Sequence, residues 1–406
     1  MDAYLLDWAN LLLRWLHVIT AIAWIGSSFY FVMLDNSLVP PTDEDLKAKG
    51  VNGELWAVHG GGFYNPQKYF VGPKQMPTGT LHWFYWESYA TWLSGFALFT
   101  LLYLFNARSF LIDASVFRWE PPVAIAAALA FLVVGWIVYD LICRIFGRNK
   151  DGSIGGDARV LALIFVYIAA ATWLACHLFA GRAAFLLMGA MIGTIMSANV
   201  FFWIIPGQRK VVADLAAGRQ PDPIHGQRGK QRSVHNTYFT LPVLIAMLSN
   251  HYGMLYQHPQ NWLVLVGLML TGALVRQFFV QRHRGKSQWE LVMVSLGLVG
   301  VLVVFVAPER SDVSASAPLA PASAAQQGGF AQVQGIVSQR CAMCHNAGLA
   351  NKNVRLDTPE LIAKNAQALY QQAVVAKTMP LNNATQITEA ERAALGRWVQ
   401  AGAKVE

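Results

Sequence analysis

The sequence predicts an all-α protein in two parts, a polytopic membrane bundle of about eight transmembrane helices and a small C-terminal domain. Three observations predict this fold class. The 406 residues are 55% hydrophobic and 13% charged, with a mean hydropathy of +0.36, whereas soluble domains are about a quarter charged. Apolar runs long enough to span a bilayer recur through the first three quarters of the chain. A C-x-x-C-H run, Cys341–His345, then lies in a tail of more polar composition.

The predicted spans are apolar runs that match a hydrocarbon core about 30 Å thick. They cover roughly residues 10–34, 83–105, 122–146, 160–180, 184–206, 236–256, 261–281 and 290–307.

The distribution of positive charge predicts the orientation of these spans. Lysines and arginines cluster in alternate loops, as in Arg144–Lys150 and Arg282–Lys286, whereas the other loops hold only Arg108, Arg118 and Arg182. The cation-rich loops are therefore expected inside, with the N-terminus outside. Because the net charge of +8 falls in these loops, it indicates membrane orientation rather than nucleic-acid binding.

Ionisable side chains within a bilayer are costly and mark functional sites. His17, His177 and His251 lie near the outer ends of their spans, where two interpretations stay open: they hold a b-type haem between helices, or they join helices through hydrogen bonds. His82 and Glu87 lie about one turn apart near an inner end. Either is a candidate proton acceptor, and a helix–helix hydrogen bond is the alternative for Glu87.

Other charged residues also fall within or near the spans. Asp140 is an acid inside the third span. Arg14 and Arg276 lie within a turn or two of span ends, so we expect their side chains to snorkel to the interface.

The first inner loop contains three consecutive glycines, Gly60–Gly62. Glycine permits positive φ and close backbone approach. His59 precedes the glycines, and aromatic residues and Lys68 follow them, a composition suited to a flat anionic ligand; a plain turn is the alternative.

The tail carries the C-x-x-C-H attachment pattern for c-type haem. Cys341 and Cys344 are spaced to bond two vinyl groups of one porphyrin, and His345 then falls under the iron as an axial ligand. Met379 is the expected second axial ligand. A redox disulfide or half of a zinc site is the alternative, although no second C-x-x-C exists in the sequence.

The segments around this motif predict a small helical domain over residues 330–406. Thr388-x-x-Glu391 is a capping box that opens a closing helix, residues 388–402, and a second helix is expected around Val333–Val337. Together with the haem motif, these segments resemble a class I cytochrome c. The Ala-, Ser- and Pro-rich residues 309–329 predict a flexible tether between this domain and a membrane domain of residues 1–308. Haem attachment on the oxidising side of a bacterial inner membrane places the tail in the periplasm, in agreement with the charge pattern.

Four stretches of the membrane part resemble the bacterial membrane-bound urate oxidases, also called urate hydroxylases, which join an eight-span domain to a C-terminal cytochrome c. The stretches are Trp24–Tyr30 (WIGSSFY), His59–Tyr64 (HGGGFY), Leu81–Glu87 (LHWFYWE) and His235–Pro242 (HNTYFTLP).

This resemblance implies oxidation of urate to 5-hydroxyisourate, with electrons passing to the covalent haem c and then to a soluble cytochrome c or a terminal oxidase. A planar anion requires cations, aromatic stacking and a base. We therefore assign His59 and Lys68 to anion binding, Trp83 to stacking, and His82 or Glu87 to the role of base. A b-type haem at His17, His177 and His251 would carry electrons across the bilayer.

Two other functions remain open on the sequence. One is a membrane cytochrome that only relays electrons in a respiratory complex. The other is a transporter with a sensor domain, which is disfavoured because the sequence shows no repeat of broken helices.

Overall fold

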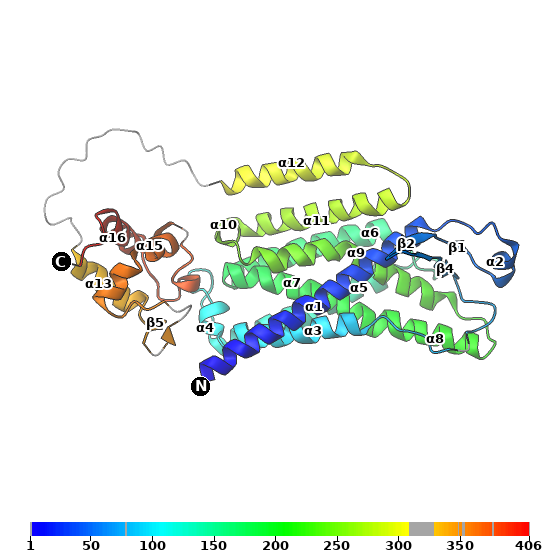
Figure 1. Cartoon of the computed structure of the whole chain (residues 1–406), viewed down its shortest axis with the longest axis horizontal. Coiled ribbons are helices and arrows are strands. Elements are labelled where there is room, and N and C mark those ends of the chain that lie inside the picture. The colour runs from blue at the N-terminus through cyan, green and yellow to red at the C-terminus, as the bar shows by residue number, and fades with distance from the viewer. Residues whose placement is uncertain are drawn as a thin grey trace.

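The computed structural model describes residues 2–77, 79–307, 329–347, 349–350, 354–375 and 377–405. It consists of a long helical bundle with a small helical domain at one end (Figure 1). We call the end of the bundle nearest the small domain the proximal end and the opposite end the distal end. The described residues are mostly helical, and their strands form three two-stranded sheets. The all-α expectation is therefore confirmed for the described residues.

Every predicted span coincides with helical structure in the bundle. The elements are α1 (Asp2–Ser37), α3 (Trp86–Phe99) with η1 (Thr100–Leu104), α5 (Pro121–Phe146), α6 (Asp157–Leu178), α7 (Gly181–Asn199) with η2 (Val200–Ile204) and α8 (Ile205–Ala216), α9 (Pro223–Ser249) with α10 (Gly253–Tyr256), α11 (Asn261–His283) and α12 (Trp289–Val306). The short helix α4 (Ala107–Phe110) follows η1.

Six helical stretches of the described residues are long and apolar enough to cross a membrane, so the chain is a multi-pass membrane protein. They comprise α1, α5, α6, the continuous run from α7 to α8, α11 and α12. The two remaining predicted spans, α3 and α9, fall outside this set. Helix α3 has 14 residues, and α9 carries Arg228, Lys230 and Arg232 in its first turns. An arrangement of eight spans stays a prediction.

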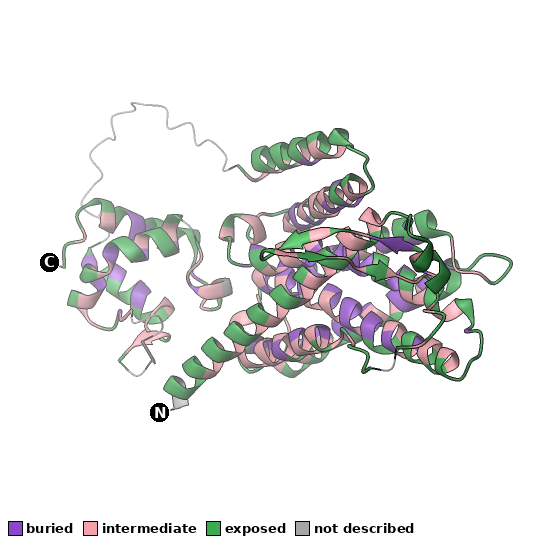
Figure 2. Cartoon of the chain, turned by 45° about the vertical axis from the view of Figure 1, so that its right-hand side comes forward, coloured by how far each residue is buried: buried purple, intermediate pink, exposed green. Residues whose placement is uncertain are grey.

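Helix α7 forms the centre of the bundle, and α1 and α12 form its margin. The apolar window of the run from α7 to α8 is 61% buried, whereas those of α1 and α12 are each 6% buried. Figure 2 shows the same contrast between purple central helices and green outer ones. Small residues such as Ala183, Ala184 and Gly189 line α7 and allow close helix packing. The apolar side chains on α1 and α12 are therefore available to lipid.

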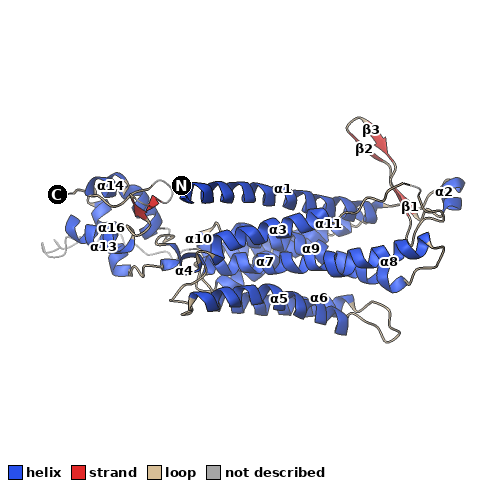
Figure 3. Cartoon of the chain, turned by 90° about the horizontal axis from the view of Figure 1, so that it is seen from below, coloured by secondary structure: helices blue, strands red, loops and turns tan. Residues whose placement is uncertain are grey.

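The distal end carries the first long loop. It contains α2 (Glu44–Lys49) and four short strands, β1 (Gly53–Glu54), β2 (Ala57–His59), β3 (Gly62–Tyr64) and β4 (Gln67–Lys68). Strand β1 pairs antiparallel with β4, and β2 pairs with β3. Gly60 and Gly61 form the hairpin turn with φ of +59° and +81°, so the prediction of positive φ is confirmed at these two glycines. Figure 3 shows this hairpin projecting from the bundle.

The small domain is built around two packed helices, α13 (Phe330–Arg340) and α16 (Glu389–Gln400). Val333, Val337, Leu395 and Trp398 are buried in their shared core. Thr388 and Glu391 form both hydrogen bonds of the predicted capping box. The other elements are β5 (His345–Asn346), β6 (Leu349–Ala350), α14 (Pro359–Lys364), α15 (Ala366–Leu369), η5 (Tyr370–Val375) and η6 (Leu381–Asn383).

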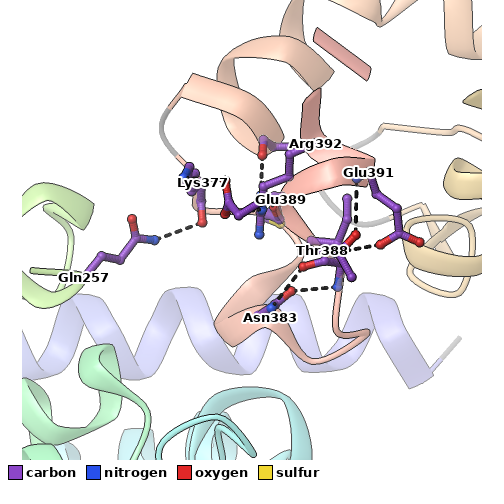
Figure 4. A network of polar contacts seen from close by, with 10 residues as sticks. Gln257, Lys377, Asn383, Thr388, Glu389, Glu391 and Arg392 are labelled. Carbon is purple, nitrogen blue, oxygen red and sulfur yellow. Dashed lines mark hydrogen bonds and ion pairs between the residues drawn. The ribbon is translucent and has the colours of Figure 1, made fainter. Parts of the chain in front are cut away.

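The small domain contacts the proximal end of the bundle through the loop before η6. The Gln257 side chain, just after α10, donates a hydrogen bond of 3.0 Å to the Lys377 carbonyl (Figure 4). The tether predicted at 309–329 lies outside the described residues except for Gly329, which is the N-cap of α13. The domain boundaries therefore stay predictions.

Candidate functional site

The C-x-x-C-H run forms a tight turn at the end of α13. The backbone N–H of Cys341 donates to the Val337 carbonyl at 2.8 Å, which closes the helix. The N–H groups of Cys344 and His345 then both donate to the Cys341 carbonyl at 3.1 Å. Cys341 and Cys344 are half-buried free thiols. Burial raises the pKa of the Cys341 thiol to about 11, so this thiol stays protonated at neutral pH.

The ring of His345 is oriented by a backbone hydrogen bond. Its Nδ1–H donates to the Val354 carbonyl at 3.1 Å, a bond that fixes the tautomer and leaves Nε2 free for a metal. A covalently attached haem requires two thiols to bond its vinyl groups and an imidazole to bind its iron, and both kinds of group are present here. The residues present therefore fit a c-type haem.

Met379 lies in the loop before η6 and is half-buried. Its backbone N–H donates to the Gln372 carbonyl at 3.0 Å. Nη1 of the buried Arg392 donates to the Met379 carbonyl at 2.8 Å and also to the Ala373 carbonyl. Arg392 thus anchors the loop of the predicted axial methionine. Sequence reasoning missed this role. An arginine among the buried positions of a predicted helix could have indicated it, because a buried cation requires hydrogen-bond acceptors.

Within the bundle, a buried ion cluster joins α5, η2 and α9. Asp140 accepts hydrogen bonds from Arg232 Nη2 at 2.7 Å and from Trp203 Nε1 at 2.8 Å, and it pairs with Arg144 at 2.6 Å. The side chains of Arg232 and Asp140 are only 4% and 6% exposed. The Arg232 guanidinium also lies over the rings of Tyr139 and Trp203, at 5.0 and 5.4 Å from their centroids. Charged groups so buried require this degree of pairing.

A neutral hydrogen-bonded chain continues from this cluster toward the centre of the bundle. The Tyr139 hydroxyl is hydrogen-bonded to His235 Nδ1 at 2.8 Å. Asn199 Nδ2 donates to Tyr139 at 2.9 Å and to Asn236 Oδ1 at 3.0 Å, and Asn236 in turn donates to the Met196 carbonyl at 3.0 Å. A tyrosine, a histidine and two amides in series form a polar network in a low-dielectric core, where hydrogen bonds strengthen one another. Sequence analysis identified Asp140 as an acid within a span but did not predict this network.

The structure connects only part of the predicted substrate site. Lys68 pairs with Asp35 at 2.5 Å and lines a cavity of about 330 Å³ beside Phe31. Phe31 contacts Phe84 at 4.9 Å between ring centroids, and Phe84 contacts His82 at 4.6 Å. Lys68 and His82 therefore belong to one aromatic region at the distal end.

The other three predicted substrate residues are not joined to that region by polar or ring contacts. His59 is exposed on the β2–β3 hairpin, whereas Trp83, before α3, and Glu87, in its first turn, are half-buried. Among the described residues, no hydrogen bond, ion pair or ring contact links His59, Trp83 or Glu87 to Lys68 or His82.

The three histidines predicted to hold a b-type haem make separate contacts. His17 Nδ1 lies 3.0 Å from the Thr91 carbonyl and 3.2 Å from Ser94 Oγ on α3. His177 bonds the Trp173 carbonyl of its own helix at 2.7 Å, and His251 is exposed after α9. In the described part of the chain, no group of three His, Cys, Asp or Glu side chains is arranged to hold a metal ion. The b-type haem stays a prediction.

Comparison with known proteins identifies the family. A family model described as urate oxidase N-terminal matches residues 3–307. The chain belongs to this family. The match to the urate oxidase N-terminal family spans the bundle and ends before the small domain. A comparison with curated proteins gave no match, and a comparison with solved structures gave none.

Membership of the urate oxidase N-terminal family indicates that the chain is an oxidoreductase and that it takes part in urate-related oxidation. The matched residues contain the buried Asp140 cluster, the Tyr139 network and the Lys68 cavity. The C-x-x-C-H turn lies outside the match. The family match therefore covers the bundle and not the cysteine turn.

Proposed function

We propose that the protein oxidises urate to 5-hydroxyisourate and passes the electrons to a haem c attached to its own C-terminal domain. The observation that carries this proposal is the presence of two parts in one chain. A bundle of the urate oxidase N-terminal family precedes a domain with two free thiols and an imidazole whose Nδ1 is already bonded. The onward acceptor is a soluble cytochrome c or a terminal oxidase of the respiratory chain.

The reaction balances without oxygen as a reactant. Urate and one water molecule give 5-hydroxyisourate, two protons and two electrons. The bundle has to bind a planar anion, admit water and accept a proton. His59 and Lys68 are the proposed anion-binding residues, Trp83 the stacking residue, and His82 or Glu87 the base. Because the electrons leave through the chain, hydrogen peroxide is not an expected product.

The residues of the small domain would hold a single haem c. Cys341 and Cys344 would form its thioether bonds, and His345 Nε2 and the Met379 sulfur would bind the iron. The bound haem supplies a one-electron acceptor of raised reduction potential. Arg392 and the Gln372 carbonyl hold the Met379 backbone in position.

The contact between the two parts supports transfer at the proximal end. Gln257 bonds the carbonyl of Lys377, two residues before Met379. The Lys68 cavity, in contrast, lies at the distal end. Electrons from a distal site would have to cross most of the bundle, so we retain the proposal of a b-type haem held by His17, His177 or His251.

We propose a bacterial inner membrane location, with the N-terminus and the cytochrome domain in the periplasm. Lys47, Lys49 and the cations after α11 lie at the distal end, which the positive-inside rule assigns to the cytoplasm. Haem attachment to C-x-x-C-H outside the cytoplasm requires the same orientation.

The proposed reaction is tested by isotope labelling. Membranes containing the protein are incubated with urate and an artificial electron acceptor in ¹⁸O-labelled water without oxygen. The expected 5-hydroxyisourate carries the label from water, and alanine variants at His59, Lys68, Trp83, His82 and Glu87 lower its formation. Failure to form 5-hydroxyisourate without oxygen, or product that lacks the label from water, would refute the proposed reaction, and full activity in all five variants would refute the assigned site.

A further inference from the structure

Arg276 is a buried arginine whose hydrogen-bonding edge has no partner among the residues that the structure describes. It lies on α11, about 10 Å before the distal end of that helix by the rise per residue, and is 3% exposed. Its Nε and Nη2 atoms are both buried without a hydrogen-bond partner. Among the described residues, no carboxylate lies within ion-pair distance of it. The prediction that Arg276 snorkels to the interface is wrong.

An aromatic ring covers one face of this guanidinium, whereas the N–H groups along its edge have no acceptor among the described residues. Cζ of Arg276 lies over the Phe29 ring at 4.1 Å from the centroid, so α1 covers one face. Nε and Nη2 form the side of the guanidinium that presents two parallel N–H groups. Two other buried arginines differ in this respect, since Arg232 pairs with Asp140 and Arg392 donates to two backbone carbonyls. Desolvating a cation without a counter-charge is unfavourable, so the edge of Arg276 requires an acceptor.

The neighbourhood of Arg276 favours an anion that is also planar. Tyr238 on α9 donates a hydrogen bond to the Gln277 side chain beside Arg276. The positive charges of Arg276 and Arg284 both act on Tyr238. One turn further along α9, Pro242 lies inside the continuous helix and lacks the N–H that would bond the Tyr238 carbonyl. The Phe29 ring, Tyr238 and the cation Arg284 therefore lie in the neighbourhood of this guanidinium.

We propose that the free edge of Arg276 binds the urate anion between α1, α9 and α11. This inference rests on the proposed function and assigns its substrate-binding residue. A deprotonated ring nitrogen and the adjacent carbonyl oxygen of urate are coplanar acceptors that match the two parallel N–H groups. Phe29 orients the guanidinium and Arg276 holds the anion. Lys68 and His59 then attract urate at the distal surface, which the orientation above places toward the cytoplasm.

The test measures binding separately from turnover. Full-length protein carrying Arg276→Met, Arg276→Lys or the control Arg282→Gln is purified in detergent without oxygen. Binding of radiolabelled urate is measured by equilibrium dialysis, and thermal unfolding is followed with and without urate. Arg282 is exposed on the same helix, so its variant controls for charge at this end of the bundle.

Both Arg276 variants are expected to bind urate at least about 100-fold more weakly, because lysine retains the charge but lacks the parallel pair of donors. Arg282→Gln should bind within about threefold of the original protein, since an exposed charge contributes little. Urate should raise the unfolding temperature of the original protein but not that of Arg276→Met. Without urate, Arg276→Met should be at least as stable as the original, because it removes an unpaired buried charge.

Unchanged urate affinity in both Arg276 variants would overturn the inference and leave the proposed function intact. Loss of stability in Arg276→Met without urate, together with retained binding in Arg276→Lys, would assign Arg276 a structural role instead. If the original protein neither binds nor oxidises urate, the proposed function itself fails.

Discussion

Asp140 and Arg276 show two ways in which this bundle holds charge. Asp140 accepts from Arg232 and Trp203 and pairs with Arg144, so it is compensated within the protein. Arg276 has the Phe29 ring against one face and, in the described part of the chain, no hydrogen-bond partner for its Nε and Nη2 atoms. Paired buried charges serve structure and specificity, whereas an unpaired one indicates a ligand.

Replacement of Asp140 by asparagine should destabilise the bundle. The change leaves Arg232 and Arg144 without their carboxylate, and breaking a buried pair in this way costs about 3–5 kcal/mol. Thermal unfolding of the purified protein in detergent measures the effect. Asp7→Asn, at an exposed position on α1, is the matched control and should unfold as the original does. Equal unfolding temperatures for the two variants would contradict a stabilising role for the Asp140 cluster.

Residues of the candidate sites were predictable where the signal is local. Cys341, Cys344 and His345 are contiguous in the sequence, so the fit to a haem could be inferred before the fold was known. The Tyr139 network was not predictable, because Asn199 and His235 meet Tyr139 only through the packing of α7 and α9 on α5. Arg276 was misassigned for the same reason. Its distance from a helix end is visible in the sequence, but the cover that Phe29 provides is not.

At the scale of the helices, hydropathy predicted where each helix lies in the sequence better than it predicted where each helix begins and ends. The predicted run 122–146 coincides with α5 almost to the residue, because Pro121 begins the helix and Gly147 ends it. Helix α9 begins at Pro223 rather than near residue 236. Its first turns are polar, and they form a helix because Asp222 caps them and Arg232 is paired inside the bundle. Composition alone does not reveal such compensation.

The closing helix α16 should contribute an acid-sensitive share of stability through its capping box. The pKa of Glu391 is lowered chiefly by the hydrogen bond from the Thr388 backbone, with a further contribution from Arg340. A lowered pKa stabilises the folded state above the unfolded value of about 4.3, and this stabilisation is lost as pH falls through the folded pKa.

Glu391→Gln should therefore reduce the loss of stability on acidification below about pH 5. Unfolding of the small domain, followed in the full-length protein by tryptophan fluorescence across this range, measures the change. A variant with the same acid dependence as the original protein would contradict the role assigned to Glu391.

At the scale of the whole molecule, the bundle and the small domain divide the proposed chemistry. The family match is confined to residues 3–307, and the cysteine turn lies beyond it. The order of these parts could be predicted from composition and one motif. Their contact through Gln257 and Lys377 could not, because it joins residues that are distant in sequence and polar in themselves.

The central claim is that urate oxidised in the bundle delivers electrons to haem held by Cys341, Cys344 and His345. The most direct measurement is the visible spectrum of purified, fully oxidised protein mixed with urate in the absence of oxygen. The account predicts that the bands of reduced c-type haem appear, and that they fail to appear in the Arg276→Met variant. A c-type haem that stays ferric with excess urate, or a preparation with no thioether-bound haem, would contradict it.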